Sequence, residues 1–205
     1  MKMLCIGRNY RDHAAELNNP VPEKPVFFLK PETALLRPGF HFYHPTFTQD
    51  IHHEIEVVVK ICKNGKSISE KFAHKYYTEI SLGLDFTARD IQADCKKKGL
   101  PWEIAKAFDH SAPVSPTFFP VAHFKDGIQN IPFELKINGE TRQLGNTKDM
   151  IFTIDQIIAY LSQFVTLKKG DLIFTGTPAG VSKINIEDHL EGFLMGEKVL
   201  NVLVK

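Results

Sequence analysis

Apolar residues occur along this chain in short runs that are separated by polar and turn-forming residues. Runs rich in Val, Ile, Leu and Phe that are bounded in this way predict β-strands. One run leads into Asn64-Gly65 and another surrounds Asn138-Gly139, and both pairs favour tight hairpin turns. The predicted strands and hairpins cover residues 1–7, 26–30, 56–62, 79–86, 133–146, 171–180 and 197–205.

Other segments have the wider apolar spacing that indicates helices. Thr87 is expected to cap a helix over 88–98 with Asp90 near the capping-box position, and Gly99 is expected to end it. Thr153 is expected to cap the helix over 153–167. Two shorter helices are expected over 9–17 and 71–77. Several strands with few helices predict a mainly β protein of the α+β class rather than an alternating βαβ fold.

Length and charge narrow the possibilities. A chain of 205 residues fits one domain, 1–205. Its 25 Lys and Arg nearly balance its 24 Asp and Glu, so no nucleic acid and no acidic membrane is expected as a partner. Cys5, Cys62 and Cys95 are widely spaced, which predicts reduced thiols. No segment resembles a signal peptide or a membrane span, and we expect a cytoplasmic protein.

The segment His52 to Glu56 places two histidines and two glutamates at the start of an apolar run. Side chains alternate between the faces of a strand, so Glu54 and Glu56 share one face. They could lie on an exposed sheet edge. If they are buried, a cation would relieve their repulsion. The spacing does not match the His-Glu-x-x-His zinc motif, and oxygen ligands favour Mg²⁺ or Mn²⁺, with Ca²⁺ as a possible substitute.

Two carboxylates are too few for such a site, and Asp85 is the candidate for a third. It interrupts the apolar run 79–86, where a lone buried carboxylate would cost several kcal/mol. A role in capping the following helix is the alternative. Arg89 and Gln92 are three residues apart on that helix, so they share a face next to Asp85.

Two further motifs could carry chemistry. His13 and Glu16 are also three apart, and such a pair can orient an imidazole or polarise water, although it also arises by chance. The segment 174–180, Phe-Thr-Gly-Thr-Pro-Ala-Gly, lacks the P-loop lysine. Its small residues could let backbone N–H groups approach a substrate carboxylate, or they could form a plain turn.

Taken together, these motifs resemble the fumarylacetoacetate hydrolase family, most closely its short acylpyruvase and oxaloacetate decarboxylase members. The resemblance covers nearly the whole chain in order. The segments that carry it are GRNYRDHAAEL, PVFFLKPETAL, HHEIEVVV, LGLDFTARDIQADCKKKGLPWEIAKAFDHSAPVSP, INGETRQLGNTKDMIFTIDQIIAYLS and GDLIFTGTPAGV. It implies a mixed β-sandwich roll, usually a homodimer.

The resemblance also implies roles for particular residues. The metal ligands would be Glu54, Glu56 and Asp85, and the catalytic pair would be His13 and Glu16. A catalytic lysine matches Lys106, and substrate contacts match Arg89, Gln92 and Thr177.

The implied substrate is a small 2-oxo dicarboxylate or 2,4-diketo acid, cleaved at a C–C bond by hydrolysis or decarboxylation through a metal-stabilised enolate. Isomerisation or tautomerisation of the same substrates is the alternative. A metal-binding protein without catalysis is a third possibility, which the intact His13–Glu16 pair disfavours.

Residues 9–25 are predicted to form a lid. Three prolines and three asparagines surround a helix too short to be stable alone. We expect this segment to keep His13 and Glu16 away from the metal until substrate closes it.

Overall fold

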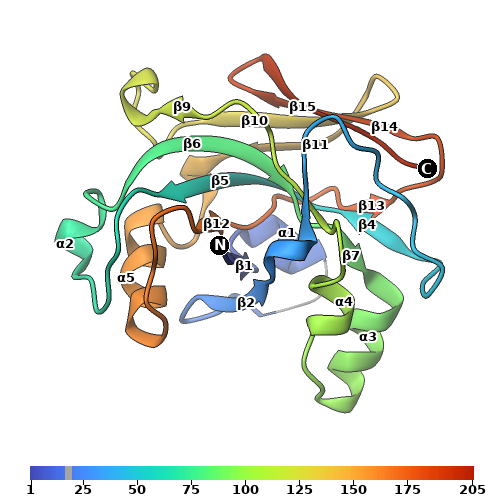
Figure 1. Cartoon of the computed structure of the whole chain (residues 1–205), viewed down its shortest axis with the longest axis horizontal. Helices are drawn as coiled ribbons and strands as arrows, with labels where there is room; N and C mark the ends of the chain where they lie inside the picture. The colour runs from blue at the N-terminus through green and yellow to red at the C-terminus, as the bar shows by residue number, and fades with distance from the viewer. Residues whose placement is uncertain (17–19) are drawn as a thin grey trace.

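The protein is described by a computed structural model that covers residues 1–16 and 20–205. Its core is a pair of β-sheets packed face to face, with helices at the periphery (Figure 1). The larger sheet has six strands, in the order β2 (Val26–Lys30), β1 (Met3–Gly7), β12 (Leu172–Phe174), β5 (Ile55–Ile61), β6 (Tyr77–Leu84) and β9 (Phe119–Pro120). The β1–β12 pair is parallel and its other pairs are antiparallel, so the sheet is mixed.

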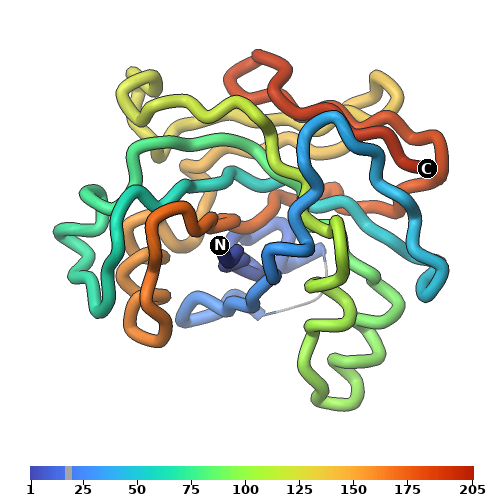
Figure 2. The backbone as a smooth tube through the Cα atoms, viewed as in Figure 1, coloured from blue at the N-terminus to red at the C-terminus, as the bar shows by residue number. Residues whose placement is uncertain are grey.

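The second large sheet is antiparallel. Its order is β11 (Glu140–Asn146), β10 (Pro132–Ile137), β14 (His189–Leu194) and β15 (Glu197–Leu203). Two small sheets complete the roll, one of β13 (Ser182–Lys183), β4 (Ile51–His53) and β7 (Thr87–Ala88), the other of β3 (Leu35–Leu36) and β8 (Ala112–Pro113). Figure 2 shows how the chain leaves the first sheet for β10 and β11, returns in β12, and ends in β14 and β15.

The helices are short. They are α1 (Arg11–Glu16), α2 (Glu70–Ala73), α3 (Arg89–Lys98), α4 (Glu103–Lys106) and α5 (Ile154–Phe164), and three 3-10 turns cover Glu32–Ala34, Val121–His123 and Thr147–Asp149. In Figure 1, α3 and α4 lie together beside β7, whereas α2 and α5 pack at the other side of the molecule. No helix in the described part of the chain is long and apolar enough to cross a membrane.

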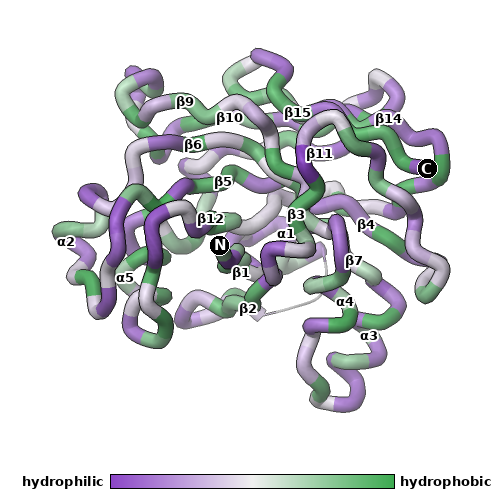
Figure 3. The backbone as a smooth tube through the Cα atoms, viewed as in Figure 1, coloured by the Kyte–Doolittle hydropathy of each residue, from purple (hydrophilic) through white to green (hydrophobic). Residues whose placement is uncertain are grey.

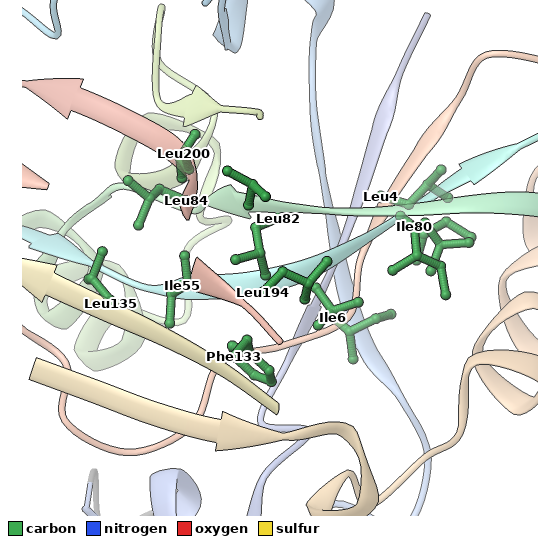
Figure 4. Packing of buried hydrophobic residues seen from close by; sticks show 14 of the residues in the cluster. Leu4, Ile6, Ile55, Ile80, Leu82, Leu84, Phe133, Leu135, Leu194 and Leu200 are labelled. Carbon is green, nitrogen blue, oxygen red and sulfur yellow. The ribbon is translucent and has the colours of Figure 1, made fainter. Parts of the chain in front are cut away.

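The main core lies between the two large sheets. Side chains from both sheets meet there, among them Ile55, Leu82 and Leu84 from the first sheet and Phe133 and Leu135 from the second (Figure 4). All five are at most 2% exposed. The hydropathy of the backbone follows this arrangement, since β5 and β12 are largely hydrophobic and α3 is largely hydrophilic (Figure 3). The mainly β, α+β class expected from the sequence is confirmed.

Three local predictions are confirmed in atomic detail. Thr153 and Gln156 form a capping box at the start of α5, because Thr153 Oγ1 accepts from the Gln156 N–H and Gln156 Oε1 accepts from the Thr153 N–H. Asn138 and Gly139 have φ angles of 53° and 83°, as the turn between β10 and β11 requires. Gly99 ends α3 with a left-handed φ of 65°.

Two other predictions are wrong. Asn64-Gly65 does not form a hairpin, because α2 lies between β5 and β6, and Gly65 pairs with Leu167 instead. A Cβ at Gly65 would lie 2.3 Å from the Tyr76 ring, so close packing accounts for this glycine. The helix expected over 71–77 is limited to α2, since Tyr77 begins β6.

The cap predicted at Thr87 is also wrong. Thr87 lies in β7, and α3 begins at Arg89 after Ala88, without a side-chain cap. The Thr87 hydroxyl accepts a hydrogen bond from Lys106 Nζ. A buried ammonium is a stronger hydrogen-bond partner than a helix N–H. The Thr87 hydroxyl therefore bonds to Lys106 and does not cap α3 as predicted.

Candidate active site

The register between β5 and β6 brings the three predicted carboxylates together. Ile55 pairs with Leu84 and Glu56 with Gly83, so Glu54 and Asp85 come next to each other at the end of the ladder, where the Asp85 N–H donates to Glu54 O. One oxygen of each of Glu54, Glu56 and Asp85 lies within 4.8 Å of the others. All three side chains are buried, so the exposed-edge alternative is excluded.

Buried cations neutralise two of these carboxylates. Lys106 Nζ donates to Glu54 Oε2 at 2.8 Å and to Asp85 Oδ2 at 2.7 Å. Arg89 Nη2 donates to Glu54 Oε1 at 2.5 Å. On the other side of the cluster, Lys30 Nζ lies 2.8 Å from Asp85 Oδ1.

Glu56 is in a different position. The Gly176 N–H donates to Glu56 Oε2 at 2.6 Å, and Glu56 makes no ion pair within the described ranges 1–16 and 20–205. Burial raises the pKa of Glu56 well above its usual range, and the carboxylates of Asp85 and Glu54 raise it further. For Glu54, burial acts in the same direction, but Lys106 and Arg89 outweigh it and hold the pKa of that carboxyl well below its usual range.

This arrangement fits a divalent cation with oxygen ligands. A buried carboxylate without a cationic partner is costly, and a cation between Glu56 and its two neighbours would remove that cost. The donor atoms are all carboxylate oxygens, as hard cations such as Mg²⁺ and Mn²⁺ prefer.

The strand that leads to the glycine-rich turn supports the same cluster. Gly176 has a φ of 99°, and a Cβ there would lie 2.6 Å from Asn9 Cβ. Only glycine allows this close approach together with the left-handed backbone. The N–H of this residue is thereby directed at Glu56, so the turn helps to position a carboxylate of the cluster.

Thr177 lines the same cavity as the carboxylates, but its hydroxyl is already bonded. It donates to Ile55 O and accepts from Gln143 Nε2, both at 2.8 Å. The predicted contact of Thr177 with a substrate carboxylate would therefore have to come from its backbone.

Lys106 is similarly occupied. Its third contact, to Thr87 Oγ1, uses the last of the three ammonium hydrogens. Burial alone would lower its pKa, but Asp85 and Glu54 more than compensate, and the pKa of Lys106 is raised. The ammonium is thus charged and held in place by the protein, which makes it a positioning group for Glu54 and Asp85 in this conformation.

The cavity beside the carboxylates has a volume of about 30 Å³. His13 and Gln92 line it together with Glu54 and Glu56. It is also lined by Ile6, Gly7, Arg8, Phe28, Arg89, Lys96, Trp102, Lys106 and Thr177. The structure therefore brings all the predicted site residues to one place except Asp85 and Glu16, and both of these contact residues of the wall.

In this conformation His13 lines the same cavity as Glu54 and Glu56, whereas the lid prediction keeps it apart until substrate binds. α1 is ordered against the site, with His13 only 5% exposed. His13 Nδ1 lies 3.0 Å from Glu16 Oε2, and the Gly180 N–H donates to Glu16 Oε1 at 3.0 Å. The turn after β12 thus anchors the glutamate that orients the imidazole. Part of the predicted lid, residues 17–19, lies outside the described residues.

Arg89 and Gln92 are brought together as predicted. Arg89 Nη1 donates to Gln92 Oε1 at 2.7 Å, and Gln92 is buried. Arg89 Nε is buried and has no hydrogen-bond partner in the described structure. Arg89 also lines the cavity.

Two buried polar residues that contact the site, Lys30 and Gln143, were not predicted. Lys30 is fully buried, and its ammonium donates to Ser111 Oγ at 2.8 Å. Gln143 uses its whole amide, because Oε1 accepts from His53 Nδ1 and the Ile55 N–H while Nε2 donates to Thr177 Oγ1 and Pro178 O. A lysine at the end of an apolar strand and a glutamine in a hairpin usually face solvent, so their sequence context contained no distinctive signal.

The fold and the site define a mixed β-sandwich roll with a buried acidic triad suited to a divalent cation and a His–Glu pair at the same cavity. The model of the fumarylacetoacetate (FAA) hydrolase C-terminal domain matches residues 2–201. The chain belongs to the fumarylacetoacetate hydrolase family, as its motifs indicated.

Individual relatives agree with this assignment. The chain is 45% identical over 203 residues to the mitochondrial oxaloacetate tautomerase FAHD1 of Mus musculus, covering 99% of this chain and 91% of that protein. It is 44% identical over 189 residues to oxaloacetate tautomerase YcgM of Escherichia coli, covering 92% and 86%. The crystal structure of fumarylpyruvate hydrolase from Pseudomonas aeruginosa in complex with Mn²⁺ and pyruvate superimposes with a TM-score of 0.92, at 36% identity, covering 100% and 89%.

Proposed function

We propose that this chain is a Mg²⁺- or Mn²⁺-dependent enzyme that transfers a proton between the keto and enol forms of a small 2-oxo acid such as oxaloacetate. The observation that carries the proposal is the His13–Glu16 pair at the same small cavity as the three carboxylates. Cleavage and tautomerisation both need this constellation. The relatives named oxaloacetate tautomerase, at 44–45% identity, are the reason for placing proton transfer first.

The residues of the site have three proposed roles: metal binding, proton transfer and binding of the substrate carboxylate. Glu54, Glu56 and Asp85 would hold the cation, which supplies Lewis acidity toward a 2-oxo group. Glu16 accepts from His13 Nδ1, so that Nε2 is the nitrogen left to take a proton from substrate carbon C3. The free Nε–H of Arg89 would bind the carboxylate of the 2-oxo acid.

Cleavage of a C–C bond remains the second candidate, whether by hydrolysis of an acylpyruvate or fumarylpyruvate or by decarboxylation of oxaloacetate. The neighbour that binds Mn²⁺ and pyruvate and carries the name fumarylpyruvate hydrolase favours it.

One experiment separates these reactions. Purified protein is treated with EDTA, reloaded with Mg²⁺ or Mn²⁺, and given the enol form of oxaloacetate. Loss of enol absorbance is followed in parallel with pyruvate formation from oxaloacetate, acetylpyruvate and fumarylpyruvate. Metal-dependent loss of enol that outpaces pyruvate release supports the tautomerase. Equal rates of the two would assign cleavage, and no turnover of any substrate would refute an enzymatic role on these compounds.

A further inference from the structure

The cavity is lined by four cations, which fall into two groups. Arg89 and Lys106 are committed to the carboxylate cluster through the contacts described above. Arg8 and Lys96 also line the cavity, but neither forms an ion pair with any residue that the structure describes. The protein thus holds two uncommitted positive charges at a site whose proposed substrates are anions.

The helix α3 places Lys96 at the outer end of the cavity. Arg89, Gln92 and Lys96 are spaced by three and four residues, so they lie on one face of the helix. Lys96 is about two turns, or roughly 10 Å, further along the axis than Arg89, and it is exposed. Arg89 and Lys96 thus enter the same cavity from two successive turns of one helix.

Lys96 packs against an aromatic ring of the cavity wall. Lys96 Nζ lies 5.5 Å from the centre of the Trp102 ring, which also lines the cavity. Partial desolvation beside the Trp102 ring lowers the pKa of Lys96, and the charges of Arg89 and Arg8 lower it further. Like charges crowded in this way repel each other, and a bound anion would relieve that repulsion.

The backbone at Arg8 gives independent support. Arg8 has a φ of 60°, a left-handed conformation that is uncommon for a residue other than glycine. Such strain tends to persist where it positions a functional side chain. Here it occurs in the turn between β1 and α1, directly before the segment that carries His13.

We propose that Arg8 and Lys96 bind the second carboxylate of the substrate, at the end remote from the 2-oxo group, and thereby make the enzyme selective for 2-oxo dicarboxylates over 2-oxo acids with a neutral end. This inference rests on the proposed function, which it extends by assigning the residues that distinguish the two substrate classes. Arg offers a fork of donors that matches a carboxylate, and Lys adds a mobile charge.

The first test compares variants on two substrates. Lys96→Met and Arg8→Gln should each lower kcat/KM for oxaloacetate by about 10- to 100-fold, as loss of a charged hydrogen bond implies, mostly through KM. The same variants should change kcat/KM for acetylpyruvate, which has a neutral end, by less than about 3-fold. Lys97→Met is the matched control, because Lys97 is an exposed neighbour that does not line the cavity, and it should leave both substrates unaffected.

The second test does not depend on turnover. Calorimetry on the Mn²⁺-loaded protein measures binding of 2-oxoglutarate and 2-oxopentanoate, which differ mainly in the distal carboxylate. The wild type should prefer 2-oxoglutarate, and both variants should lose that preference while Lys97→Met keeps it. Equal weakening of both ligands in the variants, or no preference in the wild type, would overturn the proposal even if the enzyme turns over oxaloacetate. If the wild type and the variants bind the two ligands as expected but no substrate is turned over, the anion site would stand and the proposed reaction would be rejected.

Discussion

Replacing Glu56 by Gln should make the metal-free protein more stable while abolishing its response to metal. Glu56 is 1% exposed and shares its surroundings with two other carboxylates. Glutamine keeps the shape and can still accept from the Gly176 N–H, which now donates to Glu56. A buried carboxyl without a cationic partner is costly whether it ionises or has to retain its proton, so a neutral amide of similar size should stabilise the metal-free fold by about 1–3 kcal/mol.

The effect of pH on this stability difference follows from the direction in which the pKa of Glu56 is shifted. The pKa of Glu56 is raised in the folded state, whereas the unfolded carboxyl ionises near the usual value of about 4.3. Above that pH the unfolded chain has released the proton that the folded chain retains, so the contribution of Glu56 to stability falls as pH rises. The advantage of Glu56→Gln over wild type should therefore grow from about pH 4 upward.

Metal should stabilise the wild type much more than Glu56→Gln. At a free metal concentration of 100 times Kd, binding adds about 2.7 kcal/mol to the stability of the wild type. For a chain of this size that corresponds to a rise in Tm of roughly 5–11 °C. With only two carboxylates left, Glu56→Gln should show a rise below about 2 °C.

Thermal unfolding measured with EDTA and with excess Mn²⁺ tests both the stability of the metal-free protein and its response to metal. Glu79→Gln is the matched control, because Glu79 is a surface residue paired with Lys60, and it should change Tm little and leave the Mn²⁺ response intact. The reasoning would be refuted by a Glu56→Gln protein that is less stable than wild type in EDTA, or by one that keeps the full Mn²⁺ shift.

Three further predictions concern other residues of the site. His13→Ala should reduce turnover by about 10²-fold, the usual share of a general base, and leave Mn²⁺ affinity unchanged; a comparable loss of affinity in calorimetry would show a structural role instead. Lys106→Met should cost about 3–5 kcal/mol in chemical denaturation, because it leaves Glu54 and Asp85 as buried anions; unchanged stability would contradict the described ion pairs. Burial lowers the pKa of His53 to about 4, so the unfolded chain binds the proton first as pH falls. The free energy of unfolding should therefore drop by up to about 3 kcal/mol between pH 6.5 and 4. His53→Asn should flatten this part of the stability–pH curve, and an unchanged slope would assign the pH dependence to other groups.

The sequence alone determined those features that depend on neighbours along the chain. The period of two on a strand placed Glu54 and Glu56 on one face, and Thr153 as a capping residue set the start of α5, because both follow from local backbone geometry. The family resemblance added Lys106, whose context on the short helix α4 contained no local signal.

Tertiary structure decided which partners these residues have. Thr87 bonds to Lys106 rather than capping a helix, and Gly65 packs against Tyr76 rather than turning a hairpin. Gln143 joins His53 to Thr177 across 90 and 34 positions of sequence. Such contacts depend on the register of β5 with β6 and on the packing of separate sheets. The free energy that favours these contacts comes from burial and charge pairing between segments far apart in the sequence. A local pattern of residues therefore cannot predict them.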